Sequence, residues 1–471
     1  MSFQSLAFPI FLAAFTIVYY LVPRFHMQNF LLAGVGLIFC GWVHSWFAGL
    51  LGFAALLAWA GGLAVARQKD PRNKKAVFAL CVALALGLLG AFKYFNFFAD
   101  NITAVLRGLG LGANTPLWDV LLPLGISYYT FRVIGYTADI YRGKLEARRY
   151  FSDVAAFVAF LPELPAGPIE RGGDLLPQLD RQRRWNPDAA ADGILLMLWG
   201  FFKKLVIADT VAVSANKVFL LADPSFPVLW AGVFAFSIQI YADFSGYTDI
   251  ARGATRLLGL TAARNFDHPY LAPSPRAFWR RWHMSLSFWL RDYVYIPLGG
   301  SRVSTPRWAF NILVTFALIG LWHGAAWHFV LWGVYHGLLI VAQRSVAGIV
   351  PERIRGSLPA RALGIPATFL LISAGWLIFR ESDMRCLAHY FTLSPGAAPA
   401  FQWQAGIFLC ARTALYAAPL AAHAAYAQWR DTVLPTPAAA KLVKALLGSA
   451  LALAILVLHA NVGVDFIYAN F

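Results

Sequence analysis

The chain has 471 residues, of which 59% are hydrophobic and only 13% are charged, and its mean hydropathy is +0.59. A soluble domain carries about 25% charged residues, so this composition excludes an ordinary soluble protein and predicts an all-α protein that spans a membrane. The net charge of +16 lies in short loops between apolar runs, where the positive-inside rule and anionic lipid headgroups use it, which argues against nucleic-acid binding.

Apolar runs long enough to cross a bilayer recur along the chain, and about ten to twelve spans or partial spans are expected. The first four predicted spans are Leu6–Val22, Phe30–Val43, Phe47–Val65 and Ala76–Phe92. Residues 67–75, between the third and the fourth of these, carry five positive charges and one negative charge. A loop of this kind indicates the cytoplasmic side of the membrane.

Two segments near the middle of the chain are expected to enter the membrane without crossing it. Leu121–Phe131 carries Pro123 and Gly125 inside an apolar run, and Phe157–Ile169 is too short and too proline-rich to span. Broken helices at membrane depth persist only where they are packed in protein or line a cavity. We therefore expect the first segment to be a re-entrant or kinked wall, and the second, which carries Glu163, to be re-entrant or interfacial.

The next two predicted spans, Ile194–Ile207 and Val228–Tyr241, have charged residues at their ends. The lysines of the first fit a position at the membrane interface, where long side chains reach the headgroups. The aspartates that follow the second are costly at membrane depth unless they are solvated or paired. The charged residues concerned are Lys203, Lys204, Asp243 and Asp249.

The C-terminal part adds predicted spans at Leu363–Phe379, Gly406–Ala421 and Val443–Leu458. Because no internal repeat or separate soluble domain interrupts the chain, the sequence predicts one membrane domain over residues 1–471, with its catalytic region at about residues 120–340. The four cysteines lie in apolar surroundings without paired spacing, so we expect them to pack as small hydrophobic side chains.

The stretch from Ser274 to Gly337 gathers histidine, tryptophan, arginine and glycine in a chain that is otherwise apolar. Within it, His323 lies in an apolar helix and is followed by Gly324, which leaves room for a ligand. A packed imidazole bonded to a backbone carbonyl is the structural alternative. Because an ionisable group at membrane depth is costly, the context favours catalysis, and a neutral imidazole is the usual general base for a hydroxyl.

His283 admits two interpretations. It is either an interfacial histidine held by the arginines beside it, or a second active-site group that orients the substrate. The simplest interpretation of those arginines is that they neutralise lipid headgroups. Arginine also binds phosphate in bidentate fashion. The same residues could therefore hold an anionic cofactor such as CoA at the cytoplasmic entrance. The candidate binding residues are Arg276, Trp279, Arg280, Arg281, Trp282 and Arg291.

Other chemistries are not supported by the residues. His323 and His328 stand five apart, about 140° around a helix, and no acid lies between residues 318 and 337, so no metal site is expected. His328 and His336 are expected to be structural. The surroundings of Ser285 lack a G-x-S-x-G motif, and no Gly-rich phosphate loop occurs, which argues against a serine hydrolase and an ATP-driven pump.

Eight short runs spread over almost the whole chain resemble one known family. They are Phe92–Phe98, Leu122–Phe131, Pro165–Ile169, Phe202–Asp209, Asp243–Asp249, Phe278–Ser287, Leu321–Gly324 and Phe466–Tyr468. Together these highly specific motifs resemble the membrane-bound O-acyltransferase (MBOAT) family. They are most similar to its bacterial branch that acylates cell-surface polymers, typified by the alginate O-acetylation membrane protein.

The resemblance implies a ring of tilted helices around a central funnel in the cell inner membrane. By the same likeness, His323 of the Trp-His-Gly motif is the essential catalytic residue, and His283 of the Arg-Trp-His motif is a second functional position. The implied donor is a cytoplasmic thioester, acetyl-CoA in the alginate-type branch, and no cofactor is bound tightly. The acyl group is passed to an extracytoplasmic SGNH-type acyltransferase partner in a polysaccharide biosynthesis complex. The polymer is alginate, cellulose, another exopolysaccharide or a lipopolysaccharide.

In the predicted mechanism, the thioester binds at the basic mouth near Arg276–Arg291 and His323 acts as general base on an acceptor hydroxyl. Charge on the thioester carbonyl is stabilised by nearby donors, with His283 and a Trp indole as candidates. Two alternatives stay open. One is a D-alanyl transfer protein of teichoic acid modification, which uses a carrier-protein thioester. The other is a polysaccharide or lipid transporter without chemistry, which predicts two symmetric halves that the sequence lacks.

Overall fold

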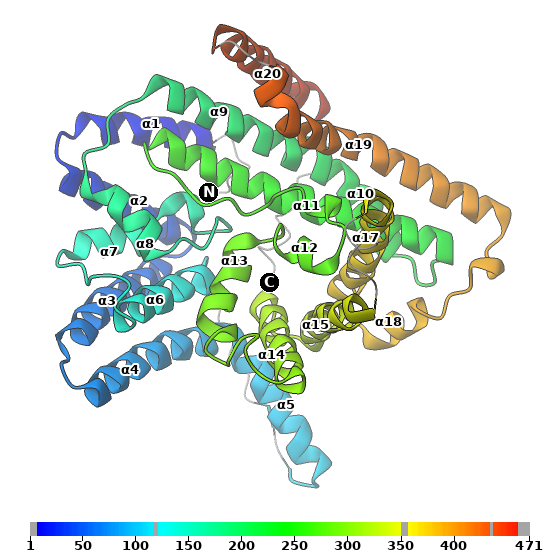
Figure 1. Cartoon of the computed structure of the whole chain (residues 1–471), viewed down its shortest axis with the longest axis horizontal. Coiled ribbons are helices and arrows are strands. Elements are labelled where there is room, and N and C mark those ends of the chain that lie inside the picture. The colour runs from blue at the N-terminus through cyan, green and yellow to red at the C-terminus, as the bar shows by residue number, and fades with distance from the viewer. Residues whose placement is uncertain (1–6, 113, 116–120, 350–356, 434–436, 460–471) are drawn as a thin grey trace. The chain divides into compact units, whose positions relative to one another are not determined.

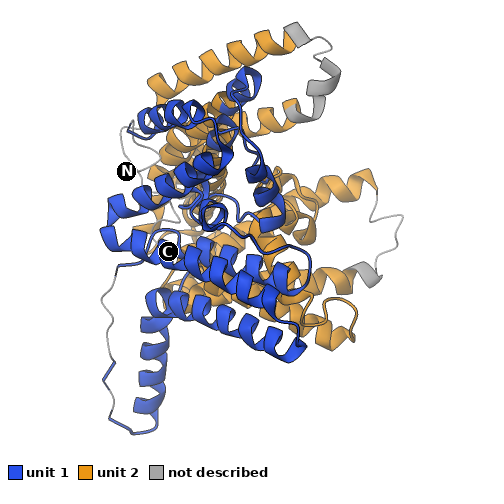
Figure 2. Cartoon of the chain, turned by 90° about the vertical axis from the view of Figure 1, so that its left-hand side faces the viewer, with its two compact units in different colours: residues 1–193, 254–263, 324–326 blue, residues 194–253, 264–323, 327–471 orange. Residues whose placement is uncertain are grey.

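The computed structural model describes residues 7–112, 114–115, 121–349, 357–433 and 437–459, so the run Phe466–Tyr468 lies outside the described residues. Every regular element within the described ranges is a helix (Figure 1), which confirms the all-α prediction. The chain divides into two compact units, coloured separately in Figure 2, and each is described by itself. Unit 1 comprises residues 1–193, 254–263 and 324–326, and unit 2 comprises residues 194–253, 264–323 and 327–471. The single domain over residues 1–471 and its catalytic region stay predictions.

Eight helices in the described part of the chain are long and apolar enough to cross a membrane, and a shorter apolar helix covers Ala7–Leu21. This confirms a polytopic membrane protein, whereas the ring of helices around a funnel stays a prediction. The eight are Phe25–Val43, Ser45–Arg67, Pro71–Gly108, Phe226–Leu257, Trp327–Val346, Leu358–Arg380, Ala400–Tyr426 and Ala439–Leu458.

Unit 1 is built from α2, α3, α4, α6 and α7, which pack on one another. The basic loop predicted after the third span ends where Asp70 accepts hydrogen bonds from the backbone N–H groups of Arg72 and Asn73, and Pro71 occupies the first position of α4. The elements are α1 (Ala7–Leu21), α2 (Phe25–Val43), α3 (Ser45–Arg67), α4 (Pro71–Leu89), η1 (Gly90–Tyr94), α5 (Phe95–Gly108), α6 (Ile126–Tyr141), α7 (Phe151–Val158), η2 (Leu161–Glu163), α8 (Gly172–Leu175) and η3 (Leu176–Asp180).

The two segments predicted to be re-entrant pack against each other in unit 1. Gly125, at φ +73°, precedes α6, and a Cβ atom there would lie 2.4 Å from the carbonyl oxygen of Leu164, so only glycine fits. Arg132 on α6 forms a fully buried ion pair with Glu163 at 2.6 Å. Glu163 therefore holds the second segment onto α6.

Unit 2 begins within α9 (Pro187–Phe201) and holds the remaining elements, except for the last turn of α11. They are η4 (Phe202–Ala208), α10 (Asp209–Phe219), α11 (Phe226–Leu257), η5 (Pro269–Leu271), α12 (Pro275–Trp279), α13 (Met284–Leu290), η6 (Arg291–Tyr295), α14 (Thr305–His323), α15 (Trp327–Ile349), α17 (Leu358–Arg380), α18 (Met384–Tyr390), η7 (Pro395–Ala397), α19 (Ala400–Val433) and α20 (Pro437–Leu458).

The charged residues that end two predicted spans face each other inside unit 2. Lys203 pairs with Asp249 at 2.7 Å, and Lys204 pairs with Asp243 at 3.0 Å and with Asp209 at 2.8 Å. We call these five residues the lysine–aspartate cluster. The interpretation that the two lysines lie at the membrane interface is wrong, since both are buried. Because its aspartates are paired, α11 continues to Leu257, sixteen residues past the predicted end at Tyr241.

Candidate active site

The helices that carry the histidine-rich region, α14 and α15, pack at backbone contact and lie side by side in Figure 1. A Cβ atom added to Gly320 would lie 2.0 Å from the carbonyl oxygen of Phe329. One added to Gly333 would lie 2.1 Å from the carbonyl oxygen of Phe316. Only small residues allow helices to approach so closely. Because α14 ends at His323, three residues after the first glycine, this contact fixes the position of the imidazole.

His323 is buried among aromatic rings. The ring centroids of Trp322, Trp332 and Phe379 lie 5.0, 5.1 and 5.6 Å from that of the imidazole. The second and third of these rings come from α15 and α17, so three helices surround the histidine. These surroundings exclude water, and a hydrogen bond made there with a substrate is stronger than one in water.

The structure brings His283 next to His323, with ring centroids 6.3 Å apart. His283 is fully buried and immediately precedes α13, and its backbone adopts the left-handed conformation, with φ 41° and ψ 54°. A non-glycine residue is strained there, and such strain clusters at functional sites. Trp322 contacts both histidines, with its ring centroid 5.5 Å from that of His283 and 5.0 Å from that of His323. We call the two histidines and the aromatic rings around His323 the histidine cage; its members are His283, His323, Trp322, Trp332 and Phe379.

A residue that sequence reasoning missed, Asn265, binds one of the two histidines. Its side-chain oxygen lies 3.2 Å from Nδ1 of His283 and accepts hydrogen bonds from the N–H and the hydroxyl of Ser285, at 3.1 and 2.9 Å. Burial lowers the pKa of His283, which lies outside the eight candidate spans, to about 3, so this imidazole is neutral at physiological pH.

A basic cavity of about 690 Å³ opens beside the cage in unit 2. Four of the six predicted binding residues line it: Arg276, Trp279, Arg280 and Arg291. The other two do not. Arg281 donates to the carbonyl oxygen of Leu271, and Trp282 is fully buried, with its ring stacked on Phe278 at 5.4 Å.

Further residues that line the basic cavity were not singled out from the sequence. Arg344 on α15 lies over the ring of Trp308 on α14, 4.1 Å from its centroid, and both line the cavity. The neighbouring Gln343 accepts a hydrogen bond from the backbone N–H of Arg276 at 2.9 Å. Arg344 and Gln343 lie beyond the stretch that ends at Gly337, so only the packing of α14 on α15 reveals their place.

Two tryptophans connect the basic cavity to the cage. Trp279 lines the cavity, and its ring centroid lies 5.7 Å from that of Trp332. Trp332 in turn lies 5.1 Å from His323. Ile319, one turn before this histidine on α14, also lines the cavity. The basic cavity and the imidazole of His323 are therefore linked by the contacting rings of Trp279 and Trp332.

Comparison with known proteins identifies the family of this chain. The sequence profile described as MBOAT, the membrane-bound O-acyltransferase family, matches residues 145–374. A probable alginate O-acetylase of Azotobacter vinelandii is 40% identical over 379 residues, which make up 80% of this chain and 74% of that protein. This chain belongs to the MBOAT family. It is therefore an O-acyltransferase and a multi-pass membrane protein.

Two further relatives of this MBOAT enzyme differ in the polymer that their names give. A peptidoglycan O-acetyltransferase of Helicobacter pylori is 33% identical over 67% of this chain and 64% of its own length. A teichoic acid D-alanyltransferase of Bacillus subtilis is 30% identical over 46% of this chain and 58% of its own length. The names of the relatives thus share acyl transfer, but they give different polymers and two different acyl groups.

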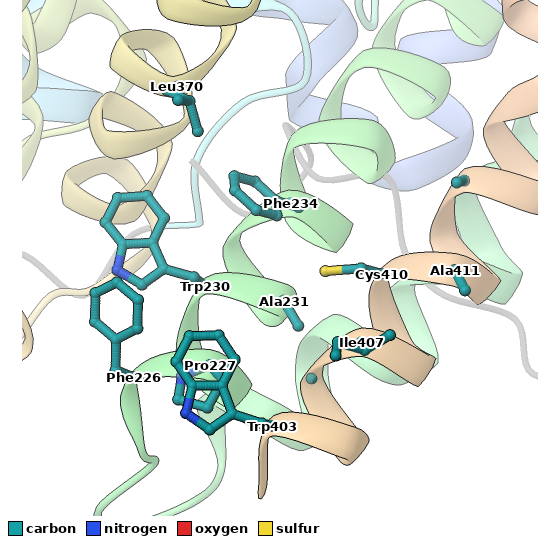
Figure 3. Close-up of a pocket in the computed structure, with 12 residues that line it drawn as sticks. Phe226, Pro227, Trp230, Ala231, Phe234, Leu370, Trp403, Ile407, Cys410 and Ala411 are labelled. Carbon is teal, nitrogen blue, oxygen red and sulfur yellow. The ribbon is translucent and has the colours of Figure 1, made fainter. Parts of the chain in front are cut away.

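A second cavity of this MBOAT enzyme, of about 730 Å³, has a different character (Figure 3). It lies between α11, α17 and α19, and its lining includes Phe226, Trp230, Trp403 and Cys410 but no charged side chain. An anionic thioester would find no cation there. Of these two cavities, only the basic one suits a phosphate-bearing donor.

The remaining histidines of this region, His328 and His336, differ in their surroundings. His328 is half-buried on the face of Phe329, and His336 is fully buried against Trp279 and Trp332. Within the described ranges, no group of three or more His, Cys, Asp or Glu side chains is placed to hold a metal ion. A structural role for both histidines stays a prediction.

Proposed function

We propose that this enzyme takes an acetyl group from a cytoplasmic thioester, acetyl-CoA, and delivers it across the cell inner membrane for O-acetylation of an exopolysaccharide such as alginate. The observation that carries the proposal is the basic cavity, whose lining residue Trp279 contacts Trp332, the ring beside buried His323. The names of the relatives support acetyl as the acyl group and a cell-surface polymer as its destination.

The donor binds in the basic cavity. Guanidinium groups of Arg276, Arg280, Arg291 and Arg344 line it, and CoA carries phosphates that such groups bind in bidentate fashion. The rings of Trp279 and Trp308 add flat apolar surface for the base or the pantetheine arm. For the thioester to reach the cage, Trp279 must turn aside, so we expect its ring to move when the donor binds.

His323 acts as general base in the cage. It takes the proton of the acceptor hydroxyl while the hydroxyl oxygen attacks the thioester carbonyl carbon. The carbon–sulfur bond then breaks, and the imidazolium returns the proton to the departing thiolate. The indole N–H of Trp332 is buried, has no hydrogen-bond partner among the described residues, and belongs to the ring beside His323, so it is the donor we assign to the developing oxyanion.

The acyl group leaves on an extracytoplasmic acceptor. We propose that the acceptor hydroxyl belongs to an SGNH-type acyltransferase partner, which completes the transfer to the polymer within a polysaccharide biosynthesis complex. Membrane lipid surrounds the enzyme. The transporter alternative loses its support because the chain belongs to a family of acyltransferases.

A second candidate, D-alanyl transfer from a carrier-protein thioester, draws support from the Bacillus subtilis relative. Both donors present a thioester on a pantetheine arm, so the cage chemistry is common to them. They differ in what the arginines bind, which is free CoA in the first case and an acidic protein surface in the second. Turnover measured with acetyl-CoA and with an acylated carrier protein distinguishes the two candidates.

The test uses purified protein in nanodiscs with radiolabelled acetyl-CoA, the partner protein and thioester turnover as the readout. His323→Ala should lower turnover about 10²–10⁴-fold, the usual contribution of a general base. His389→Ala, on an exposed histidine paired with Asp223, is the matched control and should turn over normally. Turnover that survives His323→Ala would disprove the mechanism. Activity with an acylated carrier protein, but none with acetyl-CoA, would favour the second candidate.

A further inference from the structure

The amide of Asn265 can face His283 in one orientation only. Its side-chain oxygen lies 3.1 Å from the backbone nitrogen of Ser285, which can only donate a hydrogen bond. If the amide were turned over, its NH₂ group would point at this N–H group, donor against donor. The oxygen therefore occupies the position close to both neighbours, and it also accepts from the hydroxyl of Ser285 at 2.9 Å.

This orientation determines where the proton of His283 sits. The amide oxygen carries no hydrogen, so Nδ1 of His283, 3.2 Å away, must be the donor of the bond between them. A neutral imidazole has one ring proton, and Nε2 is then bare. Nε2 is buried and has no hydrogen-bond partner among the described residues. His283 thus presents a lone pair inside the cage.

The backbone is built to keep the ring in this place. The carbonyl oxygen of Asn265 accepts from the N–H of Met284 at 2.9 Å, and the carbonyl oxygen of Arg281 accepts from the N–H of Asp267 at 2.9 Å. These two bonds hold the segment before α12 against the turn at His283, whose left-handed backbone would otherwise be costly. The ring and the amide are therefore fixed relative to each other.

We propose that Asn265 is a positioning residue that holds His283 as the Nδ1–H tautomer, so that Nε2 accepts a hydrogen bond from an O–H or N–H group of the substrate. The role within acyl transfer rests on the proposed function, whereas the tautomer does not. The proposal removes His283 from the candidate donors to the oxyanion and leaves the indole of Trp332. Under this proposal the two histidines of the cage have different roles: His283 accepts a hydrogen bond from the substrate, and His323 is the general base.

A purely structural role for Asn265 makes a different prediction. Its two acceptor oxygens satisfy the first N–H groups of α13, as a helix cap does. A cap explains the bonds to Met284 and Ser285 but does not need the imidazole. The deciding measurement must therefore follow the ring of His283 and the pH dependence of turnover, which a cap would not change.

The first experiment reads the tautomer without any turnover. The full chain is labelled with ¹⁵N-histidine in nanodiscs, and the signals of His283 are assigned by their loss in His283→Gln. At pH 7 we expect a protonated Nδ1 and an unprotonated Nε2. In Asn265→Leu the preference should disappear, with the two tautomers mixed. A wild-type signal with the proton on Nε2, or on both nitrogens, would overturn the proposal even if acyl transfer proceeds as described.

The second experiment measures turnover against pH for Asn265→Asp. A carboxylate still accepts all three hydrogen bonds, but its charge favours the imidazolium and raises the pKa of His283. The lone pair is then lost at a higher pH, so the acid limb of kcat should move up by one pH unit or more, while activity at high pH stays within about threefold of wild type. Asn265→Leu should lose about tenfold to hundredfold at every pH, as removal of an orienting hydrogen bond does.

The matched control is Asn311→Asp. Asn311 is also a fully buried asparagine of unit 2, and its amide donates to the carbonyl oxygens of Leu298 and Gly300 rather than to a histidine. It should lower stability without moving the acid limb. If Asn265→Asp and Asn311→Asp give the same pH profile, or if Asn265→Asp gains activity as the pH falls, His283 does not work as an acceptor and the proposal fails. A wild type without thioester turnover would instead defeat the proposed function and leave the tautomer to the first experiment.

Discussion

Two buried polar regions of unit 2 differ in whether their polar groups have partners inside the protein. In the lysine–aspartate cluster each charge lies within 3.0 Å of an opposite one. In the histidine cage, Nε2 of His283 and the indole N–H of Trp332 have no hydrogen-bond partner among the described residues. A paired buried charge holds helices together, whereas an open buried donor or acceptor costs stability and is kept where a substrate completes it.

The geometry of the cluster depends on a wide helical turn. Residues Phe202–Ala208 form a π-helix, and the turn directs the consecutive side chains of Lys203 and Lys204 to two aspartates of α11 six residues apart. Gly200 and Gly246 allow the approach, since a Cβ atom on the first would lie 2.6 Å from the carbonyl oxygen of the second. Backbone contact and ion pairs therefore support each other.

The largest effect on stability is expected for Lys204→Met, which leaves Asp209 and Asp243 buried without their cation. Loss of one member of a buried ion pair costs about 3–5 kcal/mol. The thermal unfolding midpoint in detergent should fall sharply, and turnover per folded molecule should change little. Lys217→Met, on an exposed lysine of α10, is the control and should unfold like wild type.

A loss of turnover without a loss of stability in Lys204→Met would contradict the division of unit 2 into a structural cluster and a catalytic cage. If Lys204→Met kept its unfolding midpoint but lost turnover, the cluster would belong to the chemistry and not to the scaffold. Asp243→Asn sharpens the test because Lys204 keeps Asp209 as its partner. We expect it to lose less stability than Lys204→Met.

The sequence predicted the cage better than the cluster, for a physical reason. His283 and His323 stood out because histidines are rare and costly in apolar runs, and the structure brings them to 6.3 Å. The aspartates at 243 and 249 were marked as needing partners, but the lysines were assigned to the membrane interface. The register of a π-helix decides which way a lysine points, and no periodicity in the sequence reveals it.

Asn265 could not be predicted from the sequence either, because its role depends on a contact that no sequence pattern reveals. Its bond to His283 joins residues 18 apart through a segment that is neither a continuous helix nor a strand, so no spacing rule connects them. Arg344 and Gln343 were missed because α15 reaches the basic cavity about two turns beyond Gly337, where the stretch that the sequence singled out ends. Residue type therefore singled out the two histidines of the candidate site, and only packing showed which residues contact and surround them.

An intermediate effect is expected for Gly320→Ala. The new Cβ atom would lie 2.0 Å from a backbone oxygen of α15, so α14 must shift, at a cost of about 1–3 kcal/mol for overpacking. Because His323 is less than one turn away, turnover should fall about 10²-fold, the usual penalty of a misplacement of about 1 Å. Thermal unfolding and thioester turnover, measured side by side, check both numbers.

Gly34→Ala is the control for this glycine. It lies inside α2, where nothing is within 4 Å of an added Cβ atom, and alanine there should stabilise the helix by about 0.5–1 kcal/mol. If both alanine variants behaved alike, backbone contact between α14 and α15 would not position the histidine. The cage would then owe its geometry to the aromatic rings alone.

The smallest effect is expected at the rim of the basic cavity, for Arg344→Ala. Arg344 is an exposed residue, so loss of one phosphate contact should cost about 1 kcal/mol and raise KM for acetyl-CoA about fivefold with kcat unchanged. The difference should shrink at high salt, because salt screens exposed charges but not the interior. Arg361→Ala, on an exposed arginine of α17 outside the cavity, should leave KM unchanged. A fall in kcat with KM unchanged would mean that Arg344 acts on the reacting atoms. The basic cavity and the histidine cage would then form one site, rather than a binding site followed by a separate catalytic site.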